Sequence, residues 1–241
     1  GEESQCSIKG KYYNLDIAIS CQGAYINGSL HKMSNIRDFG ENQNYNDFSF
    51  YAVSKNIDHL IEIFELKENT SLTKLEFGLN ICFSKNPDTL LKYNLLMFDS
   101  EEHNKNLKFK GNGFYKEFQK TDYYIKIYNK SKQYKLTQNI IRLEVKIISK
   151  RKLRNLGIYN LEDLKKKETL LRLHSFLVDK LSKLTIIDEY GKVPMESGER
   201  NCLNEYTNPN YWKKLIRDRS YKVLSNRKQK FQKLIEKYSL D

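Results

Sequence analysis

The chain has 241 residues and a mass of 28.6 kDa, which is long enough to bury a hydrophobic core without disulfides or metals. It has 42 Lys and Arg against 30 Asp and Glu, a net charge of +12, and only 11 Gly and 3 Pro. These numbers exclude collagen-like and low-complexity chains, and the lack of a run of about eighteen apolar residues argues against a membrane span. Four cysteines without a CxxC pair favour reduced thiols in a cytoplasmic protein.

Positive charge is concentrated in the second part of the chain. Residues 1–100 have 9 basic and 13 acidic side chains, whereas residues 101–241 have 33 basic and 17 acidic ones. Within 105–154, 15 basic residues are interleaved with the aromatic residues Phe114, Tyr115, Phe118, Tyr123, Tyr124 and Tyr128. This pattern favours a surface that binds a nucleic-acid backbone and stacks bases, although a solvated lysine-rich face is the alternative. A second basic stretch runs from Lys213 to Lys237.

Most predicted elements of the first 155 residues are strands. Alternation of apolar and polar residues predicts strands over 12–20, 25–33, 72–83 and 140–148, and a hairpin of 114–118 with 123–128. A loop is expected over 38–47. Apolar residues at helical spacing predict an amphipathic helix over 50–66, and Pro87 with Asp88 begins a short helix that reaches residue 96.

After residue 154 the apolar period becomes helical. Helices are predicted over 161–184, 209–217 and 221–238, with Asn160 as the N-cap of the first and Asp163 three residues on. Strands followed by helices predict an α+β fold with a mainly antiparallel sheet of about five strands and flanking helices. Helix 50–66 is expected on the apolar face of this sheet. Residues 1–155 would form the sheet core, and residues 156–241 a helical region packed on it.

In each predicted strand the polar and charged side chains lie on one face and the apolar ones on the other, because side chains alternate along a strand. The polar faces consist of Ser29 and His31; Glu76, Gly78 and Asn80; Tyr124, Lys126, Tyr128 and Lys130; and Arg142, Glu144 and Lys146. A solvated sheet face alternates in the same way, so this pattern alone leaves a plain surface as the alternative.

The polar set has the composition of a phosphodiester-cleaving site. Glu76, Glu144 and His31 would hold a hard divalent cation, Mg²⁺ or Mn²⁺, which polarises a phosphate oxygen. Tyr128 is the candidate nucleophile, and Tyr124 competes for that role. Lys126, Lys130 and Arg142 would bind phosphates and lower the pKa of the tyrosine. The residues expected to contact nucleic acid are Lys126, Lys132, Lys135, Arg142, Lys146 and Arg151.

The order of these motifs resembles rolling-circle replication initiators. GSLHK is followed by NYNDF, KLEFGLNI, IKIYNKSKQY and IRLEVKI with a basic RKLRNL tail. The resemblance is strongest to the gene II-type replication proteins of filamentous phages and the Rep_trans group of plasmid initiators, in their Bacteroidetes versions. It covers residues 25–150, and EYTNPNYWKKL near 205–215 is similar as well.

The resemblance implies a relaxase-like fold and an enzyme that nicks one DNA strand at a replication origin. Glu76 matches the family's acidic strand, Tyr128 with Lys130 its YxK strand, and Arg142 with Glu144 its RxE strand. It also implies DNA as the partner, a host helicase as a further partner, and the bacterial cytoplasm as the location. Gln133 replaces a glutamate common in the family, which keeps a binding-only DNA protein open as the alternative. An RNA-binding module is the third possibility.

Overall fold

The computed structural model describes residues 8–106, 113–217 and 221–240 and has an α+β fold with antiparallel sheets. The chain divides into two compact units. The first consists of Gly1–Thr73 and Leu153–Leu173, and the second of Lys74–Lys152 and His174–Asp241. Both units draw on residues from each side of position 155, which the predicted division into 1–155 and 156–241 did not anticipate.

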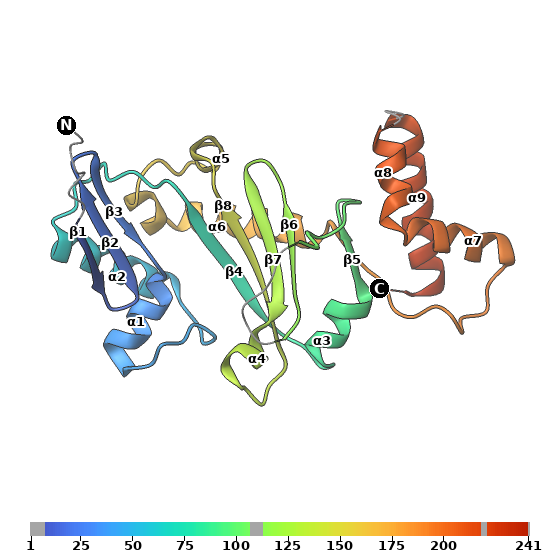
Figure 1. Ribbon diagram of the computed structural model, residues 1–241, viewed down its shortest axis with the longest axis horizontal. Helices are drawn as coiled ribbons and strands as arrows, with labels where there is room; N and C mark the ends of the chain where they lie inside the picture. The colour runs from blue at the N-terminus through green and yellow to red at the C-terminus, as the bar shows by residue number, and fades with distance from the viewer. Residues whose placement is uncertain (1–7, 107–112, 218–220, 241) are drawn as a thin grey trace, which may run out of the picture. The chain divides into compact units, whose positions relative to one another are not determined.

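The first unit contains a three-stranded antiparallel sheet and two helices. The strands, in the order β1-β2-β3, are β1 Ile8–Tyr12, β2 Leu15–Ser20 and β3 Gly23–Asn27. The helices are α1 Leu30–Phe39 and α2 Phe50–Phe64 (Figure 1). The short 3₁₀ helix η2 spans Glu162–Lys165. Leu15, Met33 and Leu60 form the unit's buried core, so one strand and both helices meet there.

Two predictions for this unit are wrong. The expected strand over 25–33 ends at Asn27, and α1 begins after Ser29, whose side chain accepts from the backbone N–H of Lys32. Ser29 thus acts as an N-cap, a role that its hydroxyl suits. The helix predicted over 50–66 is present as α2, but its Leu60 packs in the core of this unit instead of on a five-stranded sheet.

The second unit contains a four-stranded antiparallel sheet in the order β4-β8-β7-β6, instead of the sheet of about five strands that was expected. Its strands are β4 Leu75–Cys82, β6 Tyr115–Gln119, β7 Tyr123–Asn129 and β8 Ile140–Ile147. These four strands lie where the sequence predicts strands. A separate two-stranded sheet pairs β5 Leu95–Phe98 with β9 Leu184–Ile186.

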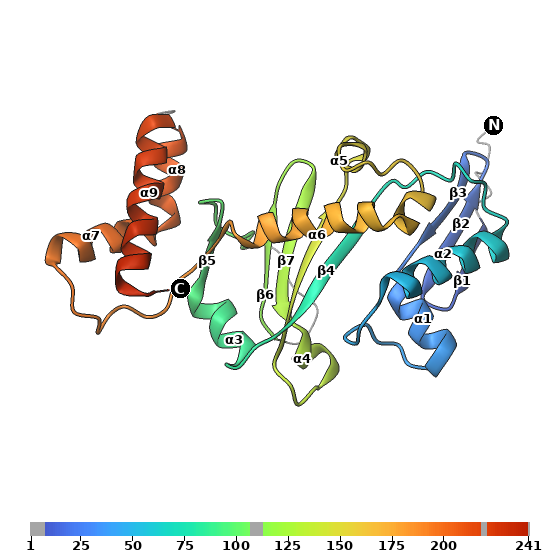
Figure 2. The ribbon, with the colours of Figure 1, turned by 180° about the vertical axis from the view of Figure 1, so that it is seen from behind.

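Short helices connect the strands. They are α3 Pro87–Thr89, the π-helix η1 Leu90–Asn94, α4 Lys130–Tyr134 and α5 Lys150–Asn155. One face of the large sheet is apolar, and Ile125, Val145 and Ile147 on it are fully buried. Residues 174–181, the second part of α6 (Lys167–Leu181), cover this face (Figure 2), where the Phe176 ring meets the Tyr123 ring edge-on.

The predicted helix over 161–184 is interrupted at both ends. The expected capping contacts exist, because the backbone N–H groups of Asn160 and Asp163 each donate to the other's side chain at 3.1 Å. They begin the 3₁₀ turn η2, and α6 follows only from Lys167. Residues 184–186 leave the helix and form β9.

The C-terminal helices of the second unit share one aromatic core. These helices are α7 Ser197–Tyr206, α8 Pro209–Arg217 and α9 Tyr221–Tyr238, and the last two match their predicted ranges. Tyr206 and Trp212 are buried in the core, and Met97 of β5 joins it, so the helices pack on the two-stranded sheet. Among the residues that the structure describes, no helix has the length and apolar character to cross a membrane.

The C-terminal core generates a stability prediction. Trp212 is the one tryptophan of the chain, and its Nε1–H donates to the carbonyl oxygen of Tyr206 at 2.7 Å. Trp212→Phe leaves that buried carbonyl without its donor, so it should lower the free energy of unfolding by about 1–3 kcal/mol. Urea denaturation monitored by far-UV circular dichroism measures this difference. Tyr211→Phe, which keeps a neighbouring ring, is the control. Equal losses in the two variants would contradict this role of the hydrogen bond.

Candidate active site

The polar residues of the large sheet form three rows across its four strands. Antiparallel register fixes the rows, and each begins on β4 and crosses β8 and β7 to β6. They are Glu76, Lys146, Tyr124 and Gln119; Gly78, Glu144, Lys126 and Glu117; and Asn80, Arg142, Tyr128 and Tyr115. The shared face predicted for the polar residues of β4, β7 and β8 is therefore confirmed, and most of the predicted site residues lie on one side of this sheet.

Gly78 makes room for the central carboxylate. It lies opposite Glu144 in the register, and a Cβ built on it would be 2.2 Å from the carbonyl oxygen of Leu143 and 2.9 Å from Cγ of Glu144. Real Cβ atoms do not approach other atoms so closely. A glycine at this position thus lets the side chain of Glu144 lie against the backbone of β4.

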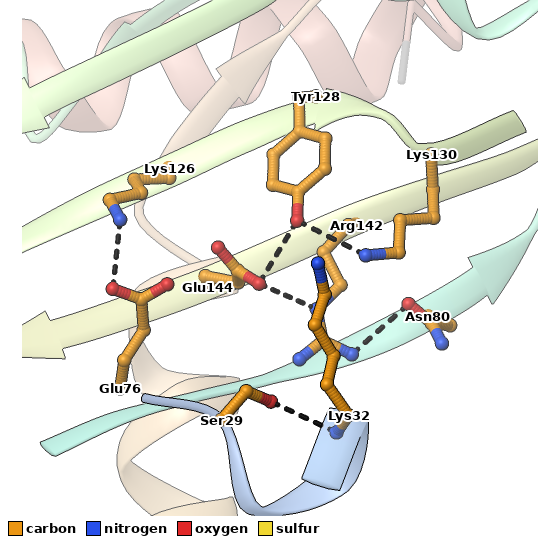
Figure 3. A network of polar contacts seen from close by, with 9 residues as sticks. All are labelled: Ser29, Lys32, Glu76, Asn80, Lys126, Tyr128, Lys130, Arg142 and Glu144. Atoms are coloured by element: carbon orange, nitrogen blue, oxygen red, sulfur yellow. Dashed lines mark hydrogen bonds and ion pairs between the residues drawn. The ribbon is translucent and has the colours of Figure 1, made fainter. Parts of the chain in front are cut away.

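A chain of hydrogen bonds centres on Glu144, which is only 6% exposed (Figure 3). Its Oε1 accepts from the hydroxyl of Tyr128 at 3.0 Å and from Nε of Arg142 at 2.9 Å. Nη1 of Arg142 in turn donates to Oδ1 of Asn80 at 3.1 Å. One buried carboxylate oxygen is therefore shared by a phenol and a guanidinium.

The sequence predicted Lys130 on the same strand as Tyr128, but it lies on helix α4 and contacts the phenol from there. Strand β7 ends at Asn129, whose side chain caps α4 by accepting from the backbone N–H of Lys132 at 3.0 Å. Lys130 is fully buried, and its Nζ donates to the hydroxyl of Tyr128 at 3.4 Å and lies 4.9 Å from the centre of the Tyr134 ring. The capped helix thus positions a buried ammonium beside Tyr128.

Glu76 and Glu144 form a carboxyl pair. Burial and the negative charge of Glu144 raise the pKa of Glu76, although Nζ of Lys126 donates to it at 2.8 Å. Burial would also raise the pKa of Glu144, but the charge of Arg142 and a hydrogen bond from Glu76 outweigh it and lower that pKa. Of the two carboxyl groups, Glu76 therefore has the raised pKa and takes up a proton first as the pH falls, whereas Glu144 has the lowered pKa.

The expectation that neighbouring cations lower the pKa of the tyrosine is wrong. Burial raises the pKa of Tyr128 strongly, the charge of Glu144 raises it further, and Arg142 opposes these effects only in part. Tyr128 is 8% exposed. Its resting form is a neutral phenol that donates a hydrogen bond to Glu144.

Strand β6 supplies functional groups that the sequence analysis did not select. The hydroxyl of Tyr115 donates to the buried carboxylate of Glu117, and Gln119 donates to the other oxygen of that carboxylate at 3.0 Å. The ring centres of Tyr115 and Tyr128 are 6.2 Å apart. The alternation of residues 115–119 carried this signal, because every second side chain of a strand shares one face.

His31 has a different setting from the one predicted. It lies in the first turn of α1, where its ring stacks on Phe48 at 4.5 Å and its Nε2 is hydrogen-bonded to Oδ1 of Asn46 at 2.7 Å. Among the described ranges, no group of three or more His, Cys, Asp and Glu residues is arranged to hold a metal ion. Glu76 and Glu144 belong to the second unit and His31 to the first, so the participation of His31 in a metal site stays a prediction.

Most of the basic residues predicted to contact nucleic acid are paired with carboxylates. Lys132 pairs with Asp88 and Arg151 with Asp122, in addition to the Lys126–Glu76 and Arg142–Glu144 pairs. Lys135 is exposed at the C-cap of α4, and Lys146 lies on the polar face. Binding a polyanion would therefore have to compete with several internal ion pairs.

Comparison with known proteins leaves the site to be judged from its geometry. No protein-family model, curated protein or solved structure matches this chain significantly. The resemblance to replication initiators rests on the order of the motifs in the sequence.

The carboxyl pair predicts a pH-dependent effect of Glu76→Gln. Because the pKa of Glu76 is raised on folding, wild-type protein loses stability as the pH rises from the unfolded value, about 4.3, through the folded one. Gln carries no proton to lose. The variant should therefore melt at the wild-type temperature in acid and above it at neutral pH.

Thermal melts between acid and neutral pH check this expectation, with Glu205→Gln on the exposed side of α7 as the control. A melting difference of the same size at every pH would show that Glu76 does not titrate in the proposed sense.

Proposed function

We propose that this chain is a replication initiator of a small phage or plasmid that nicks one DNA strand through a tyrosine. The observation that carries the proposal is the contact of one phenol, Tyr128, with both an ionised carboxylate, Glu144, and a buried ammonium, Lys130. A phenol needs a proton acceptor and a stabilising cation to attack phosphorus, and this site places one of each beside it.

The proposed step forms a covalent phosphotyrosine. Oη of Tyr128 attacks the phosphorus, the P–O3′ bond breaks, and the 3′ oxygen leaves as a hydroxyl after taking up a proton from water. The phenolic proton passes to Oε1 of Glu144, which already accepts it in a hydrogen bond of 3.0 Å. The raised pKa of Tyr128 requires proton loss and attack to occur together, since a free phenolate is not available at rest. The 5′-phosphotyrosine conserves the bond energy for later strand joining.

Cations around the phenol support the developing charge. Nζ of Lys130 lies 3.4 Å from Oη of Tyr128, so it can stabilise the phenolate character of the attacking oxygen. Arg142 holds Glu144 ionised and is itself oriented by Asn80. In this scheme Lys130 touches the reacting atom, whereas Arg142 and Asn80 act as positioning residues.

The carboxyl pair fits a divalent cation. Mg²⁺ is commonly bound through one or two carboxylates, with water and substrate phosphate as its other ligands. Glu76 and Glu144 lie close enough to share a proton, and a cation would relieve the same repulsion between them. Mg²⁺ or Mn²⁺ held there would polarise a phosphate oxygen and stabilise the charge of the transition state. His31 is not needed for such a site.

The second candidate function is DNA binding without cleavage. It is favoured by the burial of Tyr128 and by the ion pairs of Glu76 with Lys126 and of Glu144 with Arg142, which occupy the carboxylates. In that case the polar face would be a structural network beside a nucleic-acid surface. An RNA-binding module differs from both in preferring RNA when the two nucleic acids compete. Recruitment of a host helicase belongs to the initiator proposal.

The first test is a covalent-adduct assay with single-stranded origin oligonucleotides and Mn²⁺ or Mg²⁺. Tyr128→Phe should abolish the adduct and leave DNA binding intact, because it removes one hydroxyl and keeps the ring. Glu144→Gln should also stop cleavage, because it removes the proton acceptor. Adducts are counted by denaturing electrophoresis.

Tyr124→Phe is the matched control, since Tyr124 lies on the same strand and face. An adduct that persists in Tyr128→Phe and disappears in Tyr124→Phe would transfer the nucleophile to Tyr124. If wild-type protein binds origin DNA but forms no adduct at any metal concentration, the nicking function is excluded and the binding-only function takes its place.

The salt dependence of binding tests which lysines contact phosphates. The logarithm of the binding constant falls as the logarithm of the salt concentration rises. Each lost contact with single-stranded DNA should make this slope less steep by about 0.7. Lys132→Ala and Lys135→Ala should each do so, because both side chains are exposed. Lys130 is omitted because it is fully buried. Unchanged slopes, measured by fluorescence anisotropy, would mean that these lysines only solubilise the protein.

A further inference from the structure

Two exposed aromatic rings and a lysine form a cluster outside the carboxyl network. Tyr93 is 63% exposed and Phe114 is 41% exposed. Nζ of Lys92 lies 4.8 Å from the centre of the Tyr93 ring and 5.7 Å from that of Phe114, so one ammonium contacts both rings. Single exposed aromatics are ordinary, but two rings that share a cation form a compact aromatic patch. The name "aromatic platform" is used below for Lys92, Tyr93 and Phe114.

The backbone of Phe114 adjoins the row that contains Tyr128. Phe114 directly precedes Tyr115, which pairs with Tyr128 in the β6–β7 register. The carbonyl oxygen of Phe114 accepts from the backbone N–H of Asn129 at 3.2 Å, one residue beyond Tyr128. Lys92 and Tyr93 belong to the π-helix η1, which packs against β7. Such helical turns occur frequently at functional sites.

Gly113, directly before Phe114, has a backbone conformation that favours glycine. Gly113 has a φ of 87°, in the left-handed region that favours glycine, and a Cβ there would lie 3.2 Å from carbons of the Lys132 side chain. The stem of the Lys132 side chain therefore lies against Gly113. The half-exposed ammonium of Lys132 pairs with the buried carboxylate of Asp88, which also accepts from the backbone N–H of Phe114 at 3.0 Å. Two lysines thus flank exposed rings.

We propose that the aromatic platform stacks unpaired bases of single-stranded DNA next to the tyrosine site. Only an unpaired base offers a ring face to a protein ring, and stacking tolerates any base because every base has a π-face. The ammonium groups of Lys92 and Lys132 complement the phosphates between such bases. The platform rests on the proposed function for its substrate, and it specifies the form of that substrate, a strand whose bases are already unpaired where it is cut.

The test compares the full chain and the double variant Tyr93→Leu/Phe114→Leu on two oligonucleotides. One is an oligothymidylate of about ten nucleotides, and the other an abasic analogue with the same number of phosphates. Wild-type protein should bind the thymidylate more tightly. The double variant should lose about fivefold to a hundredfold in affinity for the thymidylate and nothing for the abasic strand, because leucine removes the ring and leaves the charges.

Tyr51→Leu is the control, because Tyr51 is 74% exposed and lies on α2, outside the platform. It should bind both oligonucleotides like wild type. Photocrosslinking of a thiothymidine strand should also label Tyr93 or Phe114. Equal binding of the two oligonucleotides by wild-type protein, or equal losses on both in the double variant, would overturn the proposal, as would crosslinks confined to other residues.

The outcomes separate this proposal from the nicking reaction. Loss of the thymidylate preference without loss of the Tyr128 adduct at saturating DNA supports both the platform and the enzyme. A thymidylate preference that depends on the rings in a protein that forms no adduct keeps the platform and removes the nicking function. An adduct in a protein that does not distinguish the two oligonucleotides removes the platform alone.

Discussion

The polar face of the large sheet depends on one buried charge, the carboxylate of Glu144. A carboxylate at 6% exposure is costly unless cations and hydrogen bonds compensate it. Arg142 supplies the compensating charge, Tyr128 a hydroxyl, and Gly78 the space. Removing any one partner would leave the others without their geometry, so the arrangement of the whole face follows from how this one ion is kept in the protein.

The same network decides which chemistry the tyrosine can perform. A phenol with a raised pKa is a poor nucleophile by itself, and a nearby carboxylate makes its ionisation harder while offering a place for its proton. Reaction therefore has to wait for a group that draws negative charge away. In the proposed reaction, the cations that accompany a bound phosphate would bring that change. At rest, the tyrosine in this network is therefore unreactive.

The parts of the structure that could be predicted are those that the alternation of apolar and polar residues within one β-strand reveals. Alternation over 75–82, 123–129 and 140–147 identified the strands and the face that carries Glu76, Tyr128 and Glu144. Alternation gave a wrong strand over 25–33, because residues 28–33 continue the apolar period of a strand although Ser29 is the N-cap of helix α1. The pairing of Glu76 with Lys126 depends on how neighbouring strands align, which the sequence of one strand does not reveal. The position of Lys130 depends on the end of β7 and the cap of α4, which strand alternation does not reveal either.

The path of the chain through the two units has a practical consequence. The chain changes unit after residues 73, 152 and 173, so neither unit is a continuous segment, and α6 contributes residues to both. A fragment ending at residue 155 would lack most of the second segment of one unit and the α6 residues that cover the apolar sheet face of the other. Its exposed sheet would promote aggregation. Dissection of this protein thus calls for circular permutation or internal loop grafts, and end deletions would yield incomplete pieces.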